Sequence, residues 1–146
     1  MDKAQKEALK KKILAMCDHP TVAVLATVTE DNRPWARYMA PVADENLDFR
    51  MPSNADSRKV AHIKNNPKVH LTTGVTDMET AAAYIQVEGK AEILCDKASR
   101  HAFWDEHLMR FFSGPDDPNY CVIKIIPQSI EYQSVGPVPP EVWERD

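Results

Sequence analysis

The sequence predicts a mainly β protein, an antiparallel β-barrel with flanking helices. About six short segments rich in β-branched residues are separated by turn-forming residues, which favours an antiparallel sheet over a parallel one. Helical patterns stand at the start, in the middle and late in the chain. Because 146 residues suit one hydrophobic core and no linker divides them, residues 1–146 are expected to form a single domain.

The chain is expected to begin with a helix over residues 1–19. Its apolar residues recur at helical spacing with lysines opposite: Leu9, Ile13 and Met16. The pattern ends at Asp18-His19-Pro20. Three extended segments follow, and these are Thr21–Val28, Pro34–Val42 and Leu47–Met51. The first two flank a polar turn, which predicts a hairpin.

A polar connection over residues 52–57 leads to a second helix. This helix is expected to begin at Arg58, because Asp and Ser before it are good N-caps, and to end before Pro67. The later strands are predicted at Lys68–Thr73, Ala83–Leu94, Tyr120–Ile126 and Ser129–Ser134. Gly89 interrupts the second of these strands, where we expect a β-bulge or the close approach of another backbone segment.

The remaining segments are a helix and a tail. Lys97–Phe112 carries apolar residues at helical spacing and is predicted as one long helix. Residues 135–146 contain three prolines and are expected to form an extended C-terminal tail.

Composition excludes several classes of function. The net charge of −4 and pI near 5.7 disfavour a nucleic-acid partner. No signal peptide or membrane-spanning run is visible, so we expect no membrane partner and a cytoplasmic location. Three widely spaced cysteines are interpreted as buried thiols in a reducing compartment. His101 and His107 fall on different helix faces, so no metal site is predicted.

The most informative group of polar residues is Arg37, on a predicted strand, with Ser57-Arg58-Lys59 at a predicted helix start. Free backbone N–H groups at a helix N-terminus attract anions, and arginine and lysine add charge-assisted hydrogen bonds to a phosphate. The alternative is an ordinary capped helix start whose charged residues only face water.

Several segments then resemble one known family in order and spacing. They are Arg37–Val42, Leu47–Phe49, Ser53–Lys59, Ile63–Val69, Val87–Ala91 and Ile126–Tyr132. Together these segments are similar to the core of the pyridoxamine 5′-phosphate oxidase-like split-barrel proteins, which bind flavin mononucleotide (FMN). The loop Gly114–Pro118 resembles that of the short general stress proteins in the same family.

The resemblance implies an antiparallel split β-barrel that forms a homodimer with FMN at the subunit interface. It implies that Arg37, Arg58 and Lys59 hold the FMN phosphate beside Ser57 at the helix start. It also implies that the rest of the cofactor is lined by Tyr38, Met39, Ser53 and Asn54, and approached by Tyr84 from a later strand.

Two departures from the parent oxidases concern their substrate. Those enzymes have an aromatic residue after the final Glu-Phe, where this chain has Gln133. Their C-terminal tail carries arginine and histidine, whereas the corresponding segment here, Gly136–Pro140, has neither. The resemblance therefore implies a stress-related flavin oxidoreductase of unknown substrate, with a possible nicotinamide donor, that is not a true pyridoxamine phosphate oxidase. The alternative is a non-catalytic protein that binds or stores flavin, deazaflavin or haem.

Overall fold

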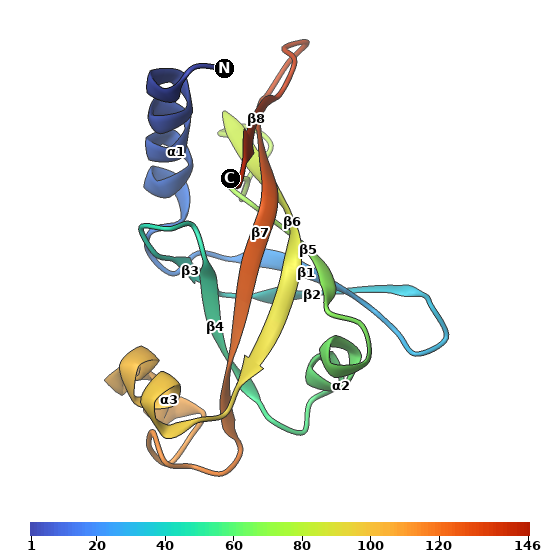
Figure 1. The fold of residues 1–146 in the computed structure, drawn as a ribbon, viewed down its shortest axis with the longest axis vertical. Coiled ribbons are helices and arrows are strands. Elements are labelled where there is room, and N and C mark those ends of the chain that lie inside the picture. The colour runs from blue at the N-terminus through green and yellow to red at the C-terminus, as the bar shows by residue number, and fades with distance from the viewer.

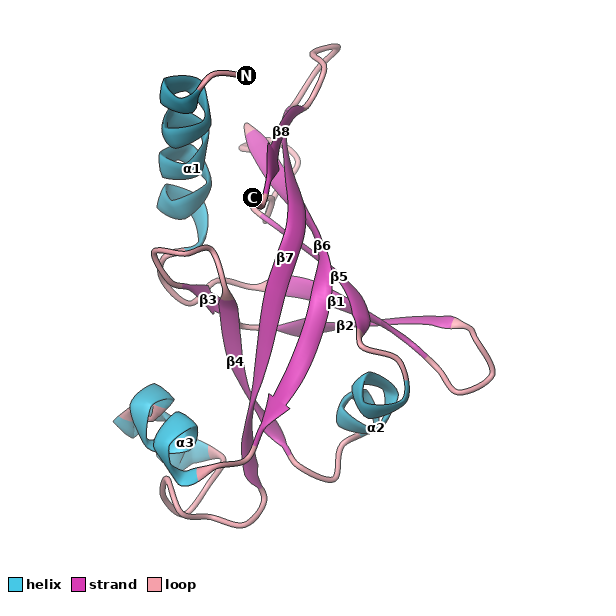
Figure 2. Ribbon diagram, viewed as in Figure 1, coloured by secondary structure: helices cyan, strands magenta, loops and turns pink.

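Eight strands form one antiparallel sheet that curls into a half-barrel in the computed structural model, which describes residues 1–146 (Figures 1 and 2). The strands are β1 (Ala23–Val28), β2 (Pro34–Met39), β3 (Val42–Ala43), β4 (Phe49–Asn54), β5 (Lys68–Thr73), β6 (Ala83–Leu94), β7 (Tyr120–Ser134) and β8 (Glu141–Glu144). The helices are α1 (Lys3–Cys17), α2 (Arg58–Asn65), α3 (Lys97–Phe103) and the short 3-10 helix η1 (Glu106–Arg110). The predicted mainly β, antiparallel architecture is confirmed.

The strand order is β2-β1-β5-β6-β7-β4-β3, and β8 pairs separately with β7. Strand β7 therefore lies between β6 and β4, although it is the last long strand of the chain. The β1–β2 hairpin projects sideways from the body of the molecule, and α2 lies beneath it (Figure 1). This arrangement brings β2 and the start of α2, which are distant in sequence, to one side of the sheet.

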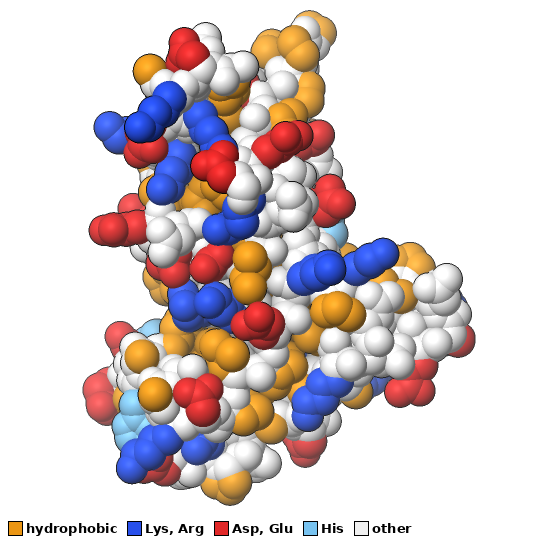
Figure 3. Space-filling view, viewed as in Figure 1, with side chains coloured by type: hydrophobic (Ala, Val, Ile, Leu, Met, Phe, Trp, Pro, Cys, Tyr) orange, Lys and Arg blue, Asp and Glu red, His pale blue; other side chains and the backbone are white.

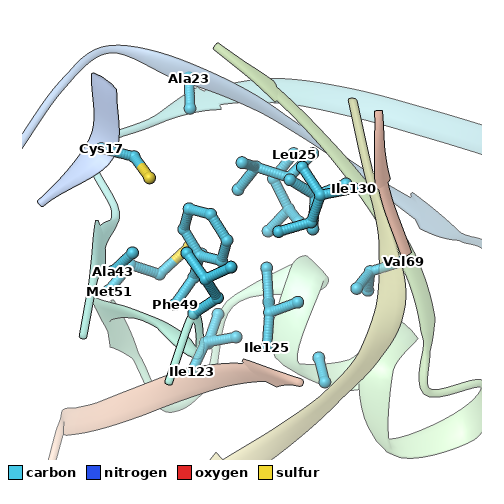
Figure 4. Packing of buried hydrophobic residues seen from close by; sticks show 14 of the residues in the cluster. Cys17, Ala23, Leu25, Ala43, Phe49, Met51, Val69, Ile123, Ile125 and Ile130 are labelled. Carbon is cyan, nitrogen blue, oxygen red and sulfur yellow. The ribbon is translucent and has the colours of Figure 1, made fainter. Parts of the chain in front are cut away.

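The inside of the curled sheet is filled by apolar side chains. Phe49, Met51 and Ile125 point into the same interior as Leu25 and Ile130 (Figure 4), and all five are fully buried. This follows from strand alternation, since every second residue of β1 and β4 faces inward. Each such side chain contributes about 1.5–3 kcal/mol relative to exposure.

Helix α1 closes one end of this interior. Asp2 accepts from the Gln5 backbone N–H at 2.8 Å, and the Gln5 side chain accepts from the Asp2 N–H at 2.9 Å, which completes a capping box. The buried face of the helix consists of Leu9, Ile13 and Cys17. The predicted N-terminal helix is thus present with nearly the expected ends.

Residues 135–146, expected as an extended tail, include a paired strand. Residues Glu141–Glu144 form β8 on β7, Trp143 is only 6% exposed, and Arg145 Nη2 lies 2.9 Å from the Asp48 carboxylate. Lys6 of α1 also forms a 2.6 Å ion pair with Asp146. The prolines of this segment led us to expect no strand. Strand β8 forms because it pairs with β7 and because neighbouring residues contact Lys6 and Asp48, which are distant in the sequence.

The predicted bulge at Gly89 is confirmed, but the two strands predicted after it are one. The β6–β7 register shifts between Glu88 and Gly89, and Gly89 lies opposite Pro127. Proline lacks a backbone N–H and is tolerated at a bulge, so β7 continues through Pro127 from Tyr120 to Ser134.

The single helix predicted over Lys97–Phe112 is wrong. Helix α3 ends at Phe103, and Trp104 and Asp105 adopt extended backbone conformations before η1 begins. The Trp104 ring packs edge-on against Tyr120 with centroids 5.3 Å apart, and Asp105 accepts from the His107 backbone N–H at 3.0 Å. Packing on β7 and a new N-cap therefore override the local helical pattern.

Charges of both signs are interspersed over the face seen in Figure 3, so no broad basic field is visible there. No helix is long and apolar enough to cross a membrane. Of the three cysteines, Cys17 and Cys121 are buried as expected, whereas Cys95 is exposed and corrects the expectation that all three are buried.

Candidate functional site

Strands β2 and β4 and the start of α2 carry eight of the nine residues predicted for the site. Arg37, Tyr38 and Met39 lie on β2, Ser53 and Asn54 end β4, and Ser57-Arg58-Lys59 begins α2. The predicted third strand is displaced, because Leu47 occupies a turn with a φ of +63° and the strand runs from Phe49 to Asn54. Ser53 and Asn54 are therefore strand residues and not part of a loop.

Arg37 is held by hydrogen bonds from its guanidinium. Its Nη1 donates to Thr27 Oγ1 at 2.7 Å and to the backbone carbonyls of Trp35 at 3.1 Å and Leu25 at 3.3 Å. Thr27 is 1% exposed, and its Oγ1 also lies 2.8 Å from Nδ1 of His62 on α2. Since arginine only donates, Thr27 accepts from Arg37 and its own proton is directed to His62 or to the Trp35 carbonyl.

Thr27 was missed by reasoning from the sequence, and His62 was interpreted as a structural histidine. The signal for Thr27 was a hydroxyl at an inward position of β1, in line with the buried Ala23 and Leu25. Buried hydroxyls need hydrogen-bond partners, so such a residue marks a polar contact inside the barrel.

The cations at this site have no carboxylate partner. None of Arg37, Arg58 and Lys59 belongs to an ion pair. Burial, and then the charge of Arg58, lowers the pKa of Arg37. Burial, and then the charge of Arg37, lowers the pKa of Lys59. A bound anion would supply the missing negative charge.

The start of α2 is also without a side-chain cap. Ser57 occupies the N-cap position, but its hydroxyl makes no capping hydrogen bond and instead lies 3.2 Å from Ser53 Oγ. This differs from the ordinary capped helix start that was the alternative interpretation. The uncapped first turn adds a partial positive charge close to Lys59.

An open hollow of about 490 Å³ adjoins these groups. It is lined by five predicted residues, Tyr38, Met39, Ser53, Asn54 and Lys59, together with Val22, Ala40, Pro52, Phe111 and Phe112. The hollow therefore combines an apolar wall with a lysine and two polar side chains. That combination suits a planar ring system attached to an anionic group.

Tyr84 and Arg58 lie outside this hollow. Tyr84 lines a larger, mostly apolar groove of about 930 Å³, whose wall it shares with Tyr38. The Arg58 guanidinium stacks over the Trp35 ring at 5.4 Å and lines a third hollow of about 360 Å³ beside His62. Seven of the nine predicted residues thus line these three hollows, whereas Arg37 and Ser57 line none of them.

Comparison with known families gives one match along most of the chain. Residues 9–134 match the family described as pyridoxamine 5′-phosphate oxidase. General stress protein 26 of Bacillus subtilis (strain 168) is 35% identical over 128 residues, which cover 88% of this chain and 90% of that protein. The pyridoxine/pyridoxamine 5′-phosphate oxidase of Enterobacter sp. (strain 638) is 33% identical over 86 residues, covering 59% of this chain and 38% of the enzyme.

Solved structures agree with the sequence matches. The general stress protein 26 of Bacillus anthracis str. Sterne has a TM-score of 0.78 at 33% identity, covering 94% of this chain and 98% of that one. An F420 reductase has a TM-score of 0.62 at 26% identity, covering 80% and 93%. A heme binding protein from Mycobacterium smegmatis has a TM-score of 0.70 at 16% identity, covering 99% and 59%, and shares the fold alone.

Proposed function

Because this chain belongs to the pyridoxamine 5′-phosphate oxidase family, we propose that it is an FMN-binding flavoprotein and an oxidoreductase. The observation that carries the proposal is the group of Arg37, Arg58 and Lys59, whose charges influence one another and have no carboxylate partner. A phosphate dianion relieves the mutual repulsion of these cations and receives charge-assisted hydrogen bonds from them. The cofactor phosphate is such a group.

Each part of the site has a separate task in this proposal. Arg37, already anchored by Thr27, presents its remaining N–H groups, and Lys59 projects its charge into the hollow beside Ser53. Apolar side chains such as Tyr38 and Phe112 cover the ring system and exclude water. FMN, when bound, supplies hydride and electron transfer, whereas the protein supplies binding and orientation.

A homodimer with the cofactor at the subunit interface is part of the proposal. Large apolar side chains stand exposed around the 930 Å³ groove: Tyr38 is 78% exposed, Val22 62% and Met78 86%. Exposed apolar surface of this kind is typical of protein interfaces. A cytoplasmic location is also proposed, supported by three free cysteines. Light scattering of the loaded protein tests the dimer, which a monomer mass would contradict.

We also propose that the protein does not oxidise pyridoxine phosphate efficiently. Gln133, in place of an aromatic residue, donates to the carbonyls of Ser134 at 2.8 Å and Val138 at 2.7 Å, which folds the segment onto itself. The following Gly136–Pro139 segment lines the large groove without a cation. Because hydride transfer needs a substrate anchored at its remote phosphate, turnover in air with pyridoxine phosphate should be absent.

A binding or storage role is the second candidate. The F420 reductase that shares the fold favours a deazaflavin as the ligand in place of FMN, although its name is that of an enzyme and does not support a role without turnover. Haem has weaker support, since the heme binding protein shares only the fold. In that role the site would hold its ligand without turnover.

The decisive experiment is to purify the protein without added ligand, record its visible spectrum and determine the mass of the extracted molecule. A flavin spectrum with the mass of FMN supports the proposal, and a haem or deazaflavin spectrum contradicts it. Stopped-flow mixing of the FMN-loaded protein with NADH or NADPH then separates a reductase, whose flavin absorbance bleaches, from a carrier, whose absorbance stays constant.

A further inference from the structure

Cys95 directly follows the last residue of β6 and Cys121 is the second residue of β7, so the two cysteines stand one step beyond the last pair of the β6–β7 ladder. Ile93 pairs with Ile123 and Leu94 with Val122, so the next residues along the two antiparallel chains are Cys95 and Cys121. Directly opposed residues in such a pair have Cα atoms about 4.5–5.5 Å apart. This range lies within the roughly 4.4–6.8 Å over which a disulfide forms.

Side-chain alternation places both thiols on one face of the sheet. Cys95 follows Ile93 by two residues and Cys121 precedes Ile123 by two, and Ile93 packs against the core cluster that contains Cys121 and Ile123. Burial, and then the neighbouring Cys95 thiol, raise the pKa of Cys121 to about 11. The two sulfur atoms are therefore close enough to influence one another.

The two thiols differ in access. Cys121 is buried and its thiol donates to the Ser53 carbonyl at 3.5 Å, whereas Cys95 is exposed just before Asp96, the N-cap of α3. The end of β6 and the start of β7 lie beside α3 at the base of the molecule in the view of Figure 1. The Cys95 thiol is therefore accessible to a small oxidant, whereas the Cys121 thiol is not.

The third cysteine has no part in this pair. Cys17 ends α1, is 1% exposed and donates to the Ile13 carbonyl at 3.1 Å. It points into the interior near Ala23 and Ala43 (Figure 4). An intramolecular disulfide therefore has one pairing available, that of Cys95 with Cys121.

We propose that Cys95 and Cys121 are an oxidisable dithiol that forms a reversible cross-strand disulfide when the protein meets hydrogen peroxide. The Cys95 sulfur attacks the O–O bond and becomes a sulfenic acid, and the released oxygen leaves as water. The Cys121 sulfur then attacks the Cys95 sulfur, and the sulfenic hydroxyl takes up the Cys121 proton and leaves as a second water. Two thiols and one peroxide give one disulfide and two waters, and a dithiol reductant reverses the change.

The disulfide would close the segment that contains α3 and η1 into a covalent loop. Such a loop loses conformational freedom in the unfolded state, so the oxidised protein should melt several degrees higher than the reduced one. This expectation does not depend on the cofactor proposal, and the experiment can be made on protein with or without flavin.

The test uses reduced, full-length protein treated with hydrogen peroxide and then alkylated under denaturing conditions. The expected product carries one alkyl group, on Cys17, and yields a peptide pair linked through Cys95 and Cys121. Dithiothreitol should restore three alkylated cysteines and the lower melting temperature. Three free thiols after peroxide treatment, or only intermolecular Cys95–Cys95 links, would overturn the proposal.

Cys95→Ser is the matched variant, because this exposed position tolerates serine without disturbing the core. After peroxide it should keep both remaining thiols and show no rise in melting temperature. Cys121→Ala is the second variant, in which Cys95 should proceed to higher oxides or to an intermolecular link. A melting temperature that rises equally in wild type and Cys95→Ser would show that the shift has another origin and would contradict the proposal.

Discussion

Arg37 on β2 donates a 2.7 Å hydrogen bond to the hydroxyl of Thr27, a side chain of β1 that is 1% exposed. The strand register makes this contact possible, since Arg37 pairs with Leu25 and Thr27 lies two residues further along the same face of β1. His62 of α2 approaches the same hydroxyl at 2.8 Å. One buried oxygen thus ties an arginine of the sheet to the helix that begins with Arg58 and Lys59.

Replacing Thr27 by valine should weaken FMN binding while leaving riboflavin binding nearly unchanged. The valine keeps the shape of the side chain but removes the acceptor that holds Arg37, at a cost of about 1.5 kcal/mol or roughly tenfold in affinity. Thr27→Ser retains the hydroxyl and should bind FMN like wild type. Fluorescence titration measures both ligands. Equal FMN losses in the valine and serine variants would show that the hydroxyl does not position the arginine.

Replacing Arg37 by methionine should lower FMN affinity more, by about tenfold to a hundredfold, because a charge-assisted hydrogen bond contributes about 1.5–3 kcal/mol. Lys11→Met is the control, since Lys11 is an exposed cation of α1 that lines none of the three hollows. The same titration with riboflavin, which lacks the phosphate, should give little change. A parallel loss for both ligands would remove Arg37 from the phosphate site.

FMN affinity relative to riboflavin should fall on the alkaline side. Burial and Arg37 lower the pKa of Lys59 below 10.5, so in the free folded protein it loses its proton at a lower pH than an unfolded lysine does. This depressed pKa costs stability at every pH below the folded pKa, and the cost is relieved as the pH rises from the folded pKa to the unfolded value of 10.5. Phosphate favours the protonated lysine, so affinity declines through the same range.

The measurement is the ratio of the FMN and riboflavin dissociation constants at a series of alkaline pH values. Because both ligands carry the same isoalloxazine ring, any titration of that ring cancels in the ratio. In the Lys59→Met variant this ratio should no longer change over the alkaline range. If that variant shows the same alkaline decline as wild type, another group is responsible.

Gly89→Ala should destabilise the fold by about 1–3 kcal/mol. A Cβ at Gly89 would stand 2.5 Å from the Ile126 carbonyl oxygen and 2.8 Å from Pro127 Cα, which are backbone atoms of the bulge and cannot turn away. Gly114→Ala is the control, because nothing lies within 4 Å of its added Cβ. Urea unfolding compares the two variants, and similar midpoints for both would show that the bulge adjusts without cost.

The sequence predicts well those parts of the fold that depend on the local alternation of apolar and polar residues and on turn-forming residues such as glycine and proline. Strands Lys68–Thr73 and Ala83–Leu94 have the expected ends, and Gly89 marks the expected bulge. The break after Phe103 was not predicted, because it depends on the contact of Trp104 with a strand much later in the chain. Strand β8 was missed for the same reason.

In the candidate site, too, the local motif was predicted and the contacts between distant segments were not. A linear motif indicated Ser57-Arg58-Lys59, and the helix does begin there. The missing cap of Ser57, the contact between Arg37 and Thr27, and the stacking of Arg58 on Trp35 depend on strand register and on packing between elements. Whether these residues bind FMN remains a prediction for the titrations above.

The position of β7 has a consequence for how the chain is made. This strand lies between β6 and β4 in the sheet, yet its residues leave the ribosome after both of its neighbours. Until β7 emerges, β4 and the twelve-residue β6 each have an unpaired edge, through which incomplete chains can associate. Because such distant pairings also form slowly, the sheet can close only after β7 has emerged, and the two strand edges stay open to association until then.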